Sequence, residues 1–247
     1  MGCDGKLVRL GNGEPPPDAS MPDSGPDRDA VGGSAAGAGG NAGGGAGGAP
    51  CPHANVAAEQ ILWIGDGWVV SPGAQHTEVR DLARASGAIG PTDDYAVQAA
   101  NGATMSAIVD QYGVQEAMAT KVKVLIMDGG TIDAIATDGS AASVSSVAAT
   151  FGQLLSTIAA DGTVQQIVYF LVPELPSIPG VATLRPVLQQ ACAKSTVPCY
   201  FVDLQGQLTW TDHPDYTAGN GILPTDAGAQ MIANLIWSTM QQNCIAQ

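Results

Sequence analysis

Two short segments of the chain combine aspartate with glycine and could carry acid–base or cation chemistry. The first is Gly65-Asp66-Gly67-Trp68, and the second is Asp128-Gly129-Gly130-Thr131-Ile132-Asp133. If Asp66 and Asp133 came together, their two carboxylates could bind a cation or exchange protons. The alternative is that each carboxylate accepts hydrogen bonds from nearby backbone N–H groups and holds its turn.

Each of these segments follows a run of apolar residues that has the length of a buried strand. Most of the runs are continuous and do not alternate with polar residues, which is typical of strands buried on both faces of a parallel sheet. The sequence predicts five such strands, at Ile61–Gly65, Tyr95–Ala100, Val122–Met127, Ile167–Val172 and Tyr200–Leu204.

Helix-length segments lie between the predicted strands, at Ala103–Ala119, Ser143–Ala160, Leu184–Ala193 and Thr225–Gln242. The last of these has the clearest apolar stripe, with Thr225 as its expected N-cap and Asp226 in its first turn. Strands that alternate with helices predict a three-layer α/β/α sandwich around a five-stranded parallel, flavodoxin-like sheet. In such sheets the functional site lies at the carboxyl ends of the strands, which is where both glycine–aspartate segments fall.

The segments at the strand ends resemble, in order and spacing, the sequence blocks of the SGNH (GDSL) hydrolase family. The quoted segments are Gly65-Asp66-Gly67, Asn101-Gly102, Gly130-Thr131-Ile132-Asp133 and Asn220-Gly221-Ile222-Leu223. The resemblance covers nearly all of residues 58–247. It implies an α/β/α fold and an ancestry among serine esterases, lipases and carbohydrate deacetylases, whose site combines a nucleophilic Ser, a Gly and an Asn at the oxyanion, and an Asp-x-x-His pair.

Four of the five positions that the resemblance assigns to catalysis hold residues without the required chemistry. Gly67 stands at the nucleophile, Ile132 at the oxyanion Asn, Asn220 at the orienting Asp and Leu223 at the general base. Gly102 is retained, and it would contribute a backbone N–H. Loss of a triad nucleophile or base lowers turnover by about 10⁶. The sequence therefore predicts a pseudoenzyme, with a cleft that holds an acyl or acetylated-glycan ligand, and it calls for no cofactor.

Two residues could replace the missing chemistry if they were brought together. Ser71 lies four positions after Gly67, and His213 precedes Asn220, so a relocated triad would make the chain an ester hydrolase. The alternative is that both are solvated loop residues. Trp68 could likewise stack against a sugar in the cleft, or it could pack at the rim of the core.

The cysteines predict an oxidised protein. The domain holds Cys51, Cys192, Cys199 and Cys244, and chain geometry favours the pairs Cys51–Cys244 and Cys192–Cys199 over the two other pairings. Buried free thiols are the alternative. No Cys-x-x-Cys occurs, so we expect no zinc site and no other metal site.

Residues 1–50 differ in composition from the rest. They hold 15 of the 32 glycines and no aromatic residue, which predicts a disordered tether, followed by one domain over residues 51–247. An N-terminal segment without a role is the alternative. Cys3 follows a small residue, as in bacterial lipoprotein processing sites, and is a candidate for lipidation. We therefore expect a location in the bacterial cell envelope or outside the cell.

The charge of the chain limits its partners. With 23 acidic and 9 basic side chains the formal net charge is −14, which argues against binding to nucleic acid or to an anionic membrane surface. No run of apolar residues reaches the length of about 18 that a membrane span requires. Contact with a membrane is expected only through a lipid on Cys3.

Overall fold

The computed structural model describes most of the predicted domain. The described residues are 56–70, 75–118, 120–136, 140–207, 214–217 and 222–245. The predicted tether over residues 1–50 and its boundary lie outside them, so both remain predictions.

The strands form one five-stranded parallel sheet, as predicted. The order is β2-β1-β3-β4-β5, the flavodoxin-like arrangement, in which the chain starts inside the sheet and reverses direction once. The strands are β1 (Ile61–Ile64), β2 (Ala96–Val97), β3 (Val124–Met127), β4 (Gln166–Leu171) and β5 (Cys199–Asp203).

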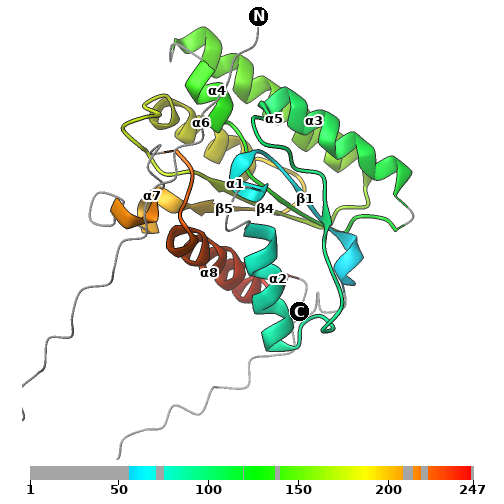
Figure 1. Cartoon of the computed structure of the whole chain (residues 1–247). Helices are drawn as coiled ribbons and strands as arrows, with labels where there is room; N and C mark the ends of the chain where they lie inside the picture. The colour runs from blue at the N-terminus through cyan, green and yellow to red at the C-terminus, as the bar shows by residue number, and fades with distance from the viewer. Residues whose placement is uncertain are drawn as a thin grey trace, which may run out of the picture. The chain divides into compact units, whose positions relative to one another are not determined.

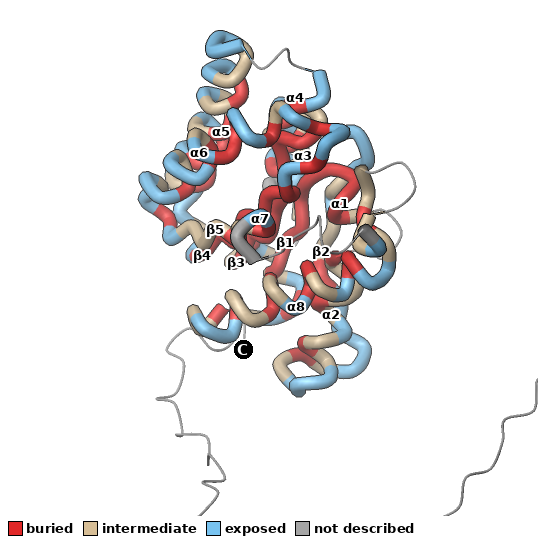
Figure 2. Tube along the Cα trace, turned by 90° about the vertical axis from the view of Figure 1, so that its left-hand side faces the viewer, coloured by how far each residue is buried: buried red, intermediate tan, exposed pale blue. Residues whose placement is uncertain are grey.

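Burial explains why the continuous apolar runs became strands. Every residue of β1, β3 and β4 is buried, which leaves no polar face (Figure 2). β2 is shorter than predicted, but its hydrogen bonds to the β1 side continue beyond it, from the Gln98 N–H to the Trp63 carbonyl at 2.8 Å and from the Ala100 N–H to the Gly65 carbonyl at 3.0 Å. The backbone therefore stays beside β1 up to the start of the Gly102 segment.

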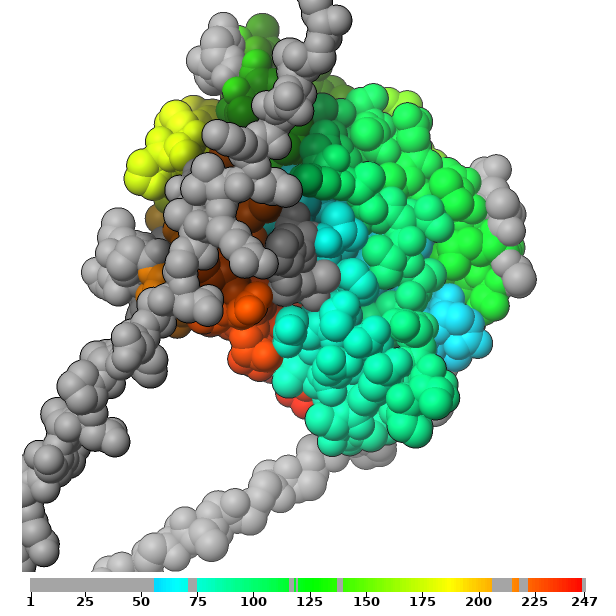
Figure 3. All heavy atoms as spheres, viewed as in Figure 1, coloured from blue at the N-terminus to red at the C-terminus, as the bar shows by residue number. Residues whose placement is uncertain are grey.

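Helices cover both faces of the sheet and complete the predicted three layers (Figure 1). On one face lie α3 (Met105–Gly113), which continues into the 3-10 helix η2 (Val114–Ala117), α5 (Ala141–Asp161) and α6 (Val181–Ala193). On the other face α8 (Asp226–Gln242) packs beside α2 (Gln75–Ser86), and Figure 3 shows the two side by side at the surface. The predicted cap of α8 is confirmed, since the Thr225 hydroxyl accepts the Gly228 N–H at 3.3 Å.

Several shorter helices and α2 were not predicted. They are η1 (Ala58–Gln60), α1 (Gly67–Val70), α4 (Thr131–Ala136), α7 (Leu204–Gln207) and η3 (Pro214–Tyr216). In α2 only Val79, Leu82 and Ala83 mark a buried face, and apart from the exposed Ala85 the rest is polar or charged. Its packing against α8 compensates for its weak periodicity, which is how tertiary contact overrides local pattern.

α5 is, among the described residues, the one helix whose length and composition would allow it to cross a membrane. Its stripe of Val147, Phe151, Leu154, Leu155 and Ile158 is buried against the sheet, with the Phe151 ring 4.7 Å from that of Tyr169. This stripe gives α5 the role of a core helix in the fold.

A disulfide joins Cys192 at the end of α6 to Cys199 at the start of β5, as predicted, with 5.3 Å between their Cα atoms. Cys244 is also disulfide-bonded. Its predicted partner Cys51 lies outside the described residues, as does Cys3. The pairing of Cys51 with Cys244 therefore stays a prediction.

Candidate functional site

The two glycine–aspartate segments meet at the carboxyl ends of β1 and β3. These strands are neighbours in the sheet, and Ile64 pairs with Met127, so the next residue pair is Gly65 and Asp128. The Asp66 N–H donates to Asp128 Oδ1 at 2.6 Å. Gly65 has φ +142°, and a Cβ there would lie 1.8 Å from Asp128 Oδ1, so only glycine permits this approach.

Asp66 and Asp128 form a buried pair of carboxyl groups. Their exposed fractions are 1% and 0%. Asp66 Oδ1 accepts the Trp68 N–H at 2.9 Å, whereas Oδ2 of each residue is buried and receives no N–H or hydroxyl bond. Burial raises the pKa of Asp128 well above its usual value, and the charge of Asp66 and the hydrogen bond between the two carboxyls raise it further. Burial and the neighbouring carboxyl therefore both favour the protonated form of Asp128.

The structure joins Asp66 to Asp128, while the pKa of Asp133 is raised by burial and also by the charge of Asp66. Asp133 lies in the first turn of α4, and its Oδ2 accepts the Met105 N–H at the start of α3 at 2.8 Å. Burial raises the pKa of Asp133, and the bond from Met105 partly offsets this. Both Asp66 and Asp133 thus accept backbone N–H bonds, as the alternative interpretation expected, although Asp133 joins two helices and does not close a local turn.

Gln111 of α3 contacts the same loop and was not identified from the sequence. The Gly65 N–H donates to Gln111 Oε1 at 2.7 Å, and Gln111 Nε2 donates to the Gly65 carbonyl at 3.0 Å. A glutamine on a helix carries no sequence signal for such a role, because the same residue is normal on a solvated face. Gly65 is thus fixed by the Ala100 N–H after β2, by Gln111 and by the fit against Asp128.

The positions that the resemblance assigns to catalysis carry no reactive side chain among the described residues. Gly67 is buried at the first residue of α1, and Ile132 and Leu223 are half-buried. Gly102 is exposed with φ +81°, and a Cβ there would meet nothing within 4 Å. Asn220 lies outside the described residues, as do Ser71 and His213, so the structure does not test the relocated triad.

The aromatic and imidazole groups of this region are occupied by structural contacts. Trp68 is 1% exposed, which favours its packing role over stacking on a sugar. His76 of α2 contacts the Val69 carbonyl through Nδ1 at 3.0 Å and the Thr77 hydroxyl through Nε2 at 3.2 Å. His76 thereby joins α2 to the end of α1. Asp66 and Trp68 lie beneath the surface of the predicted cleft.

A cluster of ion pairs lies at the carboxyl ends of β4 and β5, and it was also not identified from the sequence. Arg185 of α6 is 7% exposed and donates to the Val172 carbonyl at 2.6 Å and to Asp203 Oδ1 at 2.5 Å. Its Nε lies 3.6 Å from Glu174 Oε1. The guanidinium therefore connects the ends of β4 and β5 through Nη1 and Nη2, while its buried Nε has no hydrogen-bond partner among the described residues.

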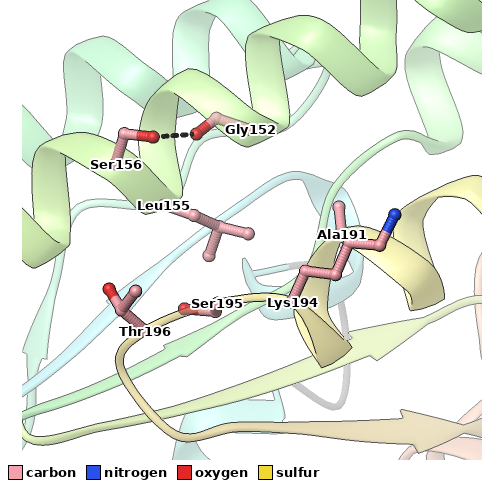
Figure 4. A pocket seen from close by; sticks show the side chains of 7 residues that line it. All are labelled: Gly152, Leu155, Ser156, Ala191, Lys194, Ser195 and Thr196. Atoms are coloured by element: carbon pink, nitrogen blue, oxygen red, sulfur yellow. Dashed lines mark hydrogen bonds between the residues drawn. The ribbon is translucent and has the colours of Figure 1, made fainter.

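Hollows in the described surface lie both near and far from this site. A pocket of about 480 Å³ borders Gly102 and is lined by the amides of Gln98, Asn101 and Gln111, by Asp110 and by the half-exposed Val114. Another, of about 300 Å³, lies between α5 and the segment after α6, with Leu155 at its centre and Ser195 and Thr196 at its edge (Figure 4). Thr196 precedes β5, so this second pocket is at the opposite end of the strands from the site.

No group of three or more His, Cys, Asp or Glu side chains in the described part of the chain is arranged to hold a metal ion. The described acids of the site are instead engaged with backbone N–H groups or with each other. Their arrangement stabilises the loops that follow β1 and β3.

Comparison with solved structures places this fold among those of SGNH (GDSL)-type esterases. An acetyl xylan esterase matches with a TM-score of 0.57 and 12% identity, covering 72% of this chain and 98% of the esterase. A carbohydrate esterase of family 3 from Talaromyces cellulolyticus matches with a TM-score of 0.59 and 17% identity, covering 74% of this chain and 96% of the esterase. A GDSL-like lipase, described as putative, from Parabacteroides merdae matches with a TM-score of 0.58 and 15% identity, covering 77% of this chain and 99% of the lipase.

No protein-family model and no curated protein sequence matches the chain. At these low identities the structural matches show the fold alone. The five-stranded sandwich that the resemblance implied is thereby confirmed, and the chemistry of the site must be argued from the residues present.

Proposed function

We propose that this chain is a non-catalytic binding protein built on the fold of an SGNH-type ester hydrolase. The observation that supports the proposal is the set of residues at the strand ends. Gly67 has no side chain, and Ile132 and Leu223 are apolar. A hydrolase of this fold needs a nucleophile, a donor and a base at those positions, and loss of one triad member lowers turnover by about 10⁶.

The ligand class that we propose is an acyl chain or an acetylated glycan. Ile132 and Leu223 offer apolar surface in place of polar chemistry, which suits an acyl or acetyl group. The pocket beside Gly102 offers amide and carboxylate side chains from Gln98, Asn101 and Asp110 for hydroxyl groups. Two of the neighbours in fold are carbohydrate-directed esterases by name, which supports the acetylated glycan.

We place this function outside the cytoplasm. The disulfide between Cys192 and Cys199 suits an oxidising compartment. A lipid on Cys3 followed by the glycine-rich segment would tether the domain to an envelope membrane. Globomycin treatment of the expressing bacterium, or mass analysis of the N-terminal peptide, tests the lipid, and an unmodified Cys3 in the mature protein would contradict the tether.

Ligand binding is measured on the full oxidised chain by thermal shift with acetylated xylan, deacetylated xylan and a medium-chain fatty acid. We expect stabilisation by one acylated ligand and not by deacetylated xylan. Only a ligand that binds the native state lowers its free energy relative to the unfolded state. Ile132→Asp should abolish the shift, while Ile135→Asp, the same change at an exposed apolar residue of α4 that lines none of these pockets, serves as the control. The absence of any shift at high ligand concentration would contradict the binding role.

The second candidate function is an ester hydrolase that uses Ser71 and His213. It predicts turnover of a short-chain aryl ester that is lost in both Ser71→Ala and His213→Ala. Activity that survives both substitutions would exclude this relocated pair.

A further inference from the structure

The buried carboxyl pair formed by Asp66 and Asp128 is unusual because no cationic side chain of the described residues acts on Asp128. The surrounding elements contribute Asp133 from α4 and Tyr169 from β4, and Arg185 of α6 is bonded to Asp203 and Val172. α3 contributes the uncharged Gln111 and Met105. His76 of α2 contacts the Val69 carbonyl at the far end of α1. Two ionised carboxylates in this setting would repel each other without compensation.

Among the described residues, the hydrogen bonds leave Oδ2 of each carboxyl for a shared proton. Oδ1 of Asp128 accepts the Asp66 N–H, and Oδ1 of Asp66 accepts the Trp68 N–H. Both Oδ2 atoms are buried and receive no other donor. One proton on Asp128 Oδ2, donated to Asp66, satisfies both atoms at once and leaves a single negative charge, which two backbone N–H groups help to stabilise.

We propose that Asp66 and Asp128 share one proton, and that this proton acts as a pH-sensitive latch between the β1–α1 loop, directly before Gly67, and the end of β3. When the Oδ2–H bond of Asp128 breaks, the proton passes to solvent and two carboxylates face each other. Their repulsion strains the backbone that they contact, because Asp128 accepts the Asp66 N–H and Asp66 accepts the Trp68 N–H. The loop at the former nucleophile position is then released from β3.

The sign of the pH dependence follows from the raised pKa of Asp128. An unfolded aspartate titrates near pH 3.9, and the folded residue titrates at higher pH. Below about pH 3.9 both states hold the proton, so its contribution to stability is complete. As pH rises above that value the unfolded state releases its proton and the folded state does not, so stability falls until pH passes the folded pKa.

Asp128→Asn is the decisive variant because it mimics the protonated form permanently. Its Oδ1 can accept the Asp66 N–H, and its Nδ2 can donate to Asp66. Asp110→Asn is the matched control: it makes the same charge change at an exposed position on α3. Comparison of the two variants separates the pair from the general repulsion within an acidic protein.

The experiment is equilibrium unfolding of the full oxidised chain between pH 4 and pH 9. For wild type and Asp110→Asn we expect the unfolding constant to rise about tenfold more per pH unit than for Asp128→Asn, up to the folded pKa. Parallel curves for wild type and Asp128→Asn would overturn the proposal. If Asp128→Asn fails to fold, infrared spectroscopy of the wild-type protein tests the proposal instead. The absence of a protonated-carboxyl band at neutral pH would overturn the shared proton.

Hydrogen exchange tests the latch itself. Protection of the Asp66 and Trp68 amides, corrected for intrinsic exchange, should fall at high pH in the wild-type protein and persist in Asp128→Asn. Equal loss of protection in both proteins would show that the loop opens independently of the pair. None of these readouts requires a ligand, so they are independent of the binding role proposed above.

Discussion

The side-chain amide of Gln111 bonds to both backbone polar groups of Gly65, at 2.7 Å and 3.0 Å. This contact joins α3 to the loop after β1, across 46 positions in sequence. Gln111→Ala should lower the free energy of unfolding by about 1–3 kcal/mol, because it leaves the buried Gly65 N–H without its side-chain acceptor. Chemical denaturation measures this, with the exposed Gln98→Ala as control. Equal effects of both substitutions would contradict the importance of the contact.

Gly65→Ala should prevent folding or destabilise the protein by more than about 3 kcal/mol. The new Cβ would overlap Asp128 Oδ1, and φ +142° is strained for any L residue with a side chain. Gly102→Ala is the comparison, since Gly102 also has a positive φ but open space around it. That variant should lose only about 1–2 kcal/mol from backbone strain. A Gly65→Ala protein as stable as Gly102→Ala would disprove the close approach of Asp128.

Removing the disulfide by Cys192→Ala and Cys199→Ala together should cost about 2 kcal/mol, the value that the chain-entropy model gives for so short a loop. Thermal unfolding of wild type with and without reductant provides the measurement. The double variant should be insensitive to reductant at this site. Intact mass before and after reduction and alkylation counts the bonds, and a protein with no mass change would contradict the oxidised state.

The parallel sheet was predictable because its strands are buried on both faces, so β1, β3 and β4 appear in the sequence as continuous apolar runs. α8 was predictable from its capping Thr225 and its apolar stripe. α2 was not, because its stability depends on contact with α8 rather than on its own pattern. The length of the edge strand β2 was overestimated, because the residues after it stay beside β1 without extending the strand.

The site was predictable in position but not in its contacts. The segments after β1 and β3 had to meet, because parallel neighbours end at the same edge. Which acid would face Asp66 depended on the register, and the pairing of Ile64 with Met127 brings Asp128 rather than Asp133 opposite the loop. The role of Gln111 could not be inferred, since a helix position alone does not reveal which distant backbone group a side chain reaches.

Restoring the missing chemistry tests whether the scaffold is an esterase fold without its catalytic residues. The variant carries Gly67→Ser, Ile132→Asn, Asn220→Asp and Leu223→His. The φ angle of Gly67 is not positive, so the backbone conformation there is allowed for serine. The repaired chain should gain turnover of a short-chain ester, and Gly67→Ser alone should gain far less, because a nucleophile without its base is poorly activated.

The central claim, that the native chain has no activated serine, is tested most directly by intact mass after treatment with a fluorophosphonate probe. The account predicts no adduct on the wild-type oxidised chain and one adduct on the fourfold repaired variant, mapped to residue 67. A single stoichiometric adduct on the wild-type chain would contradict the account, and the modified peptide would identify the nucleophile, with Ser71 as the first position to examine.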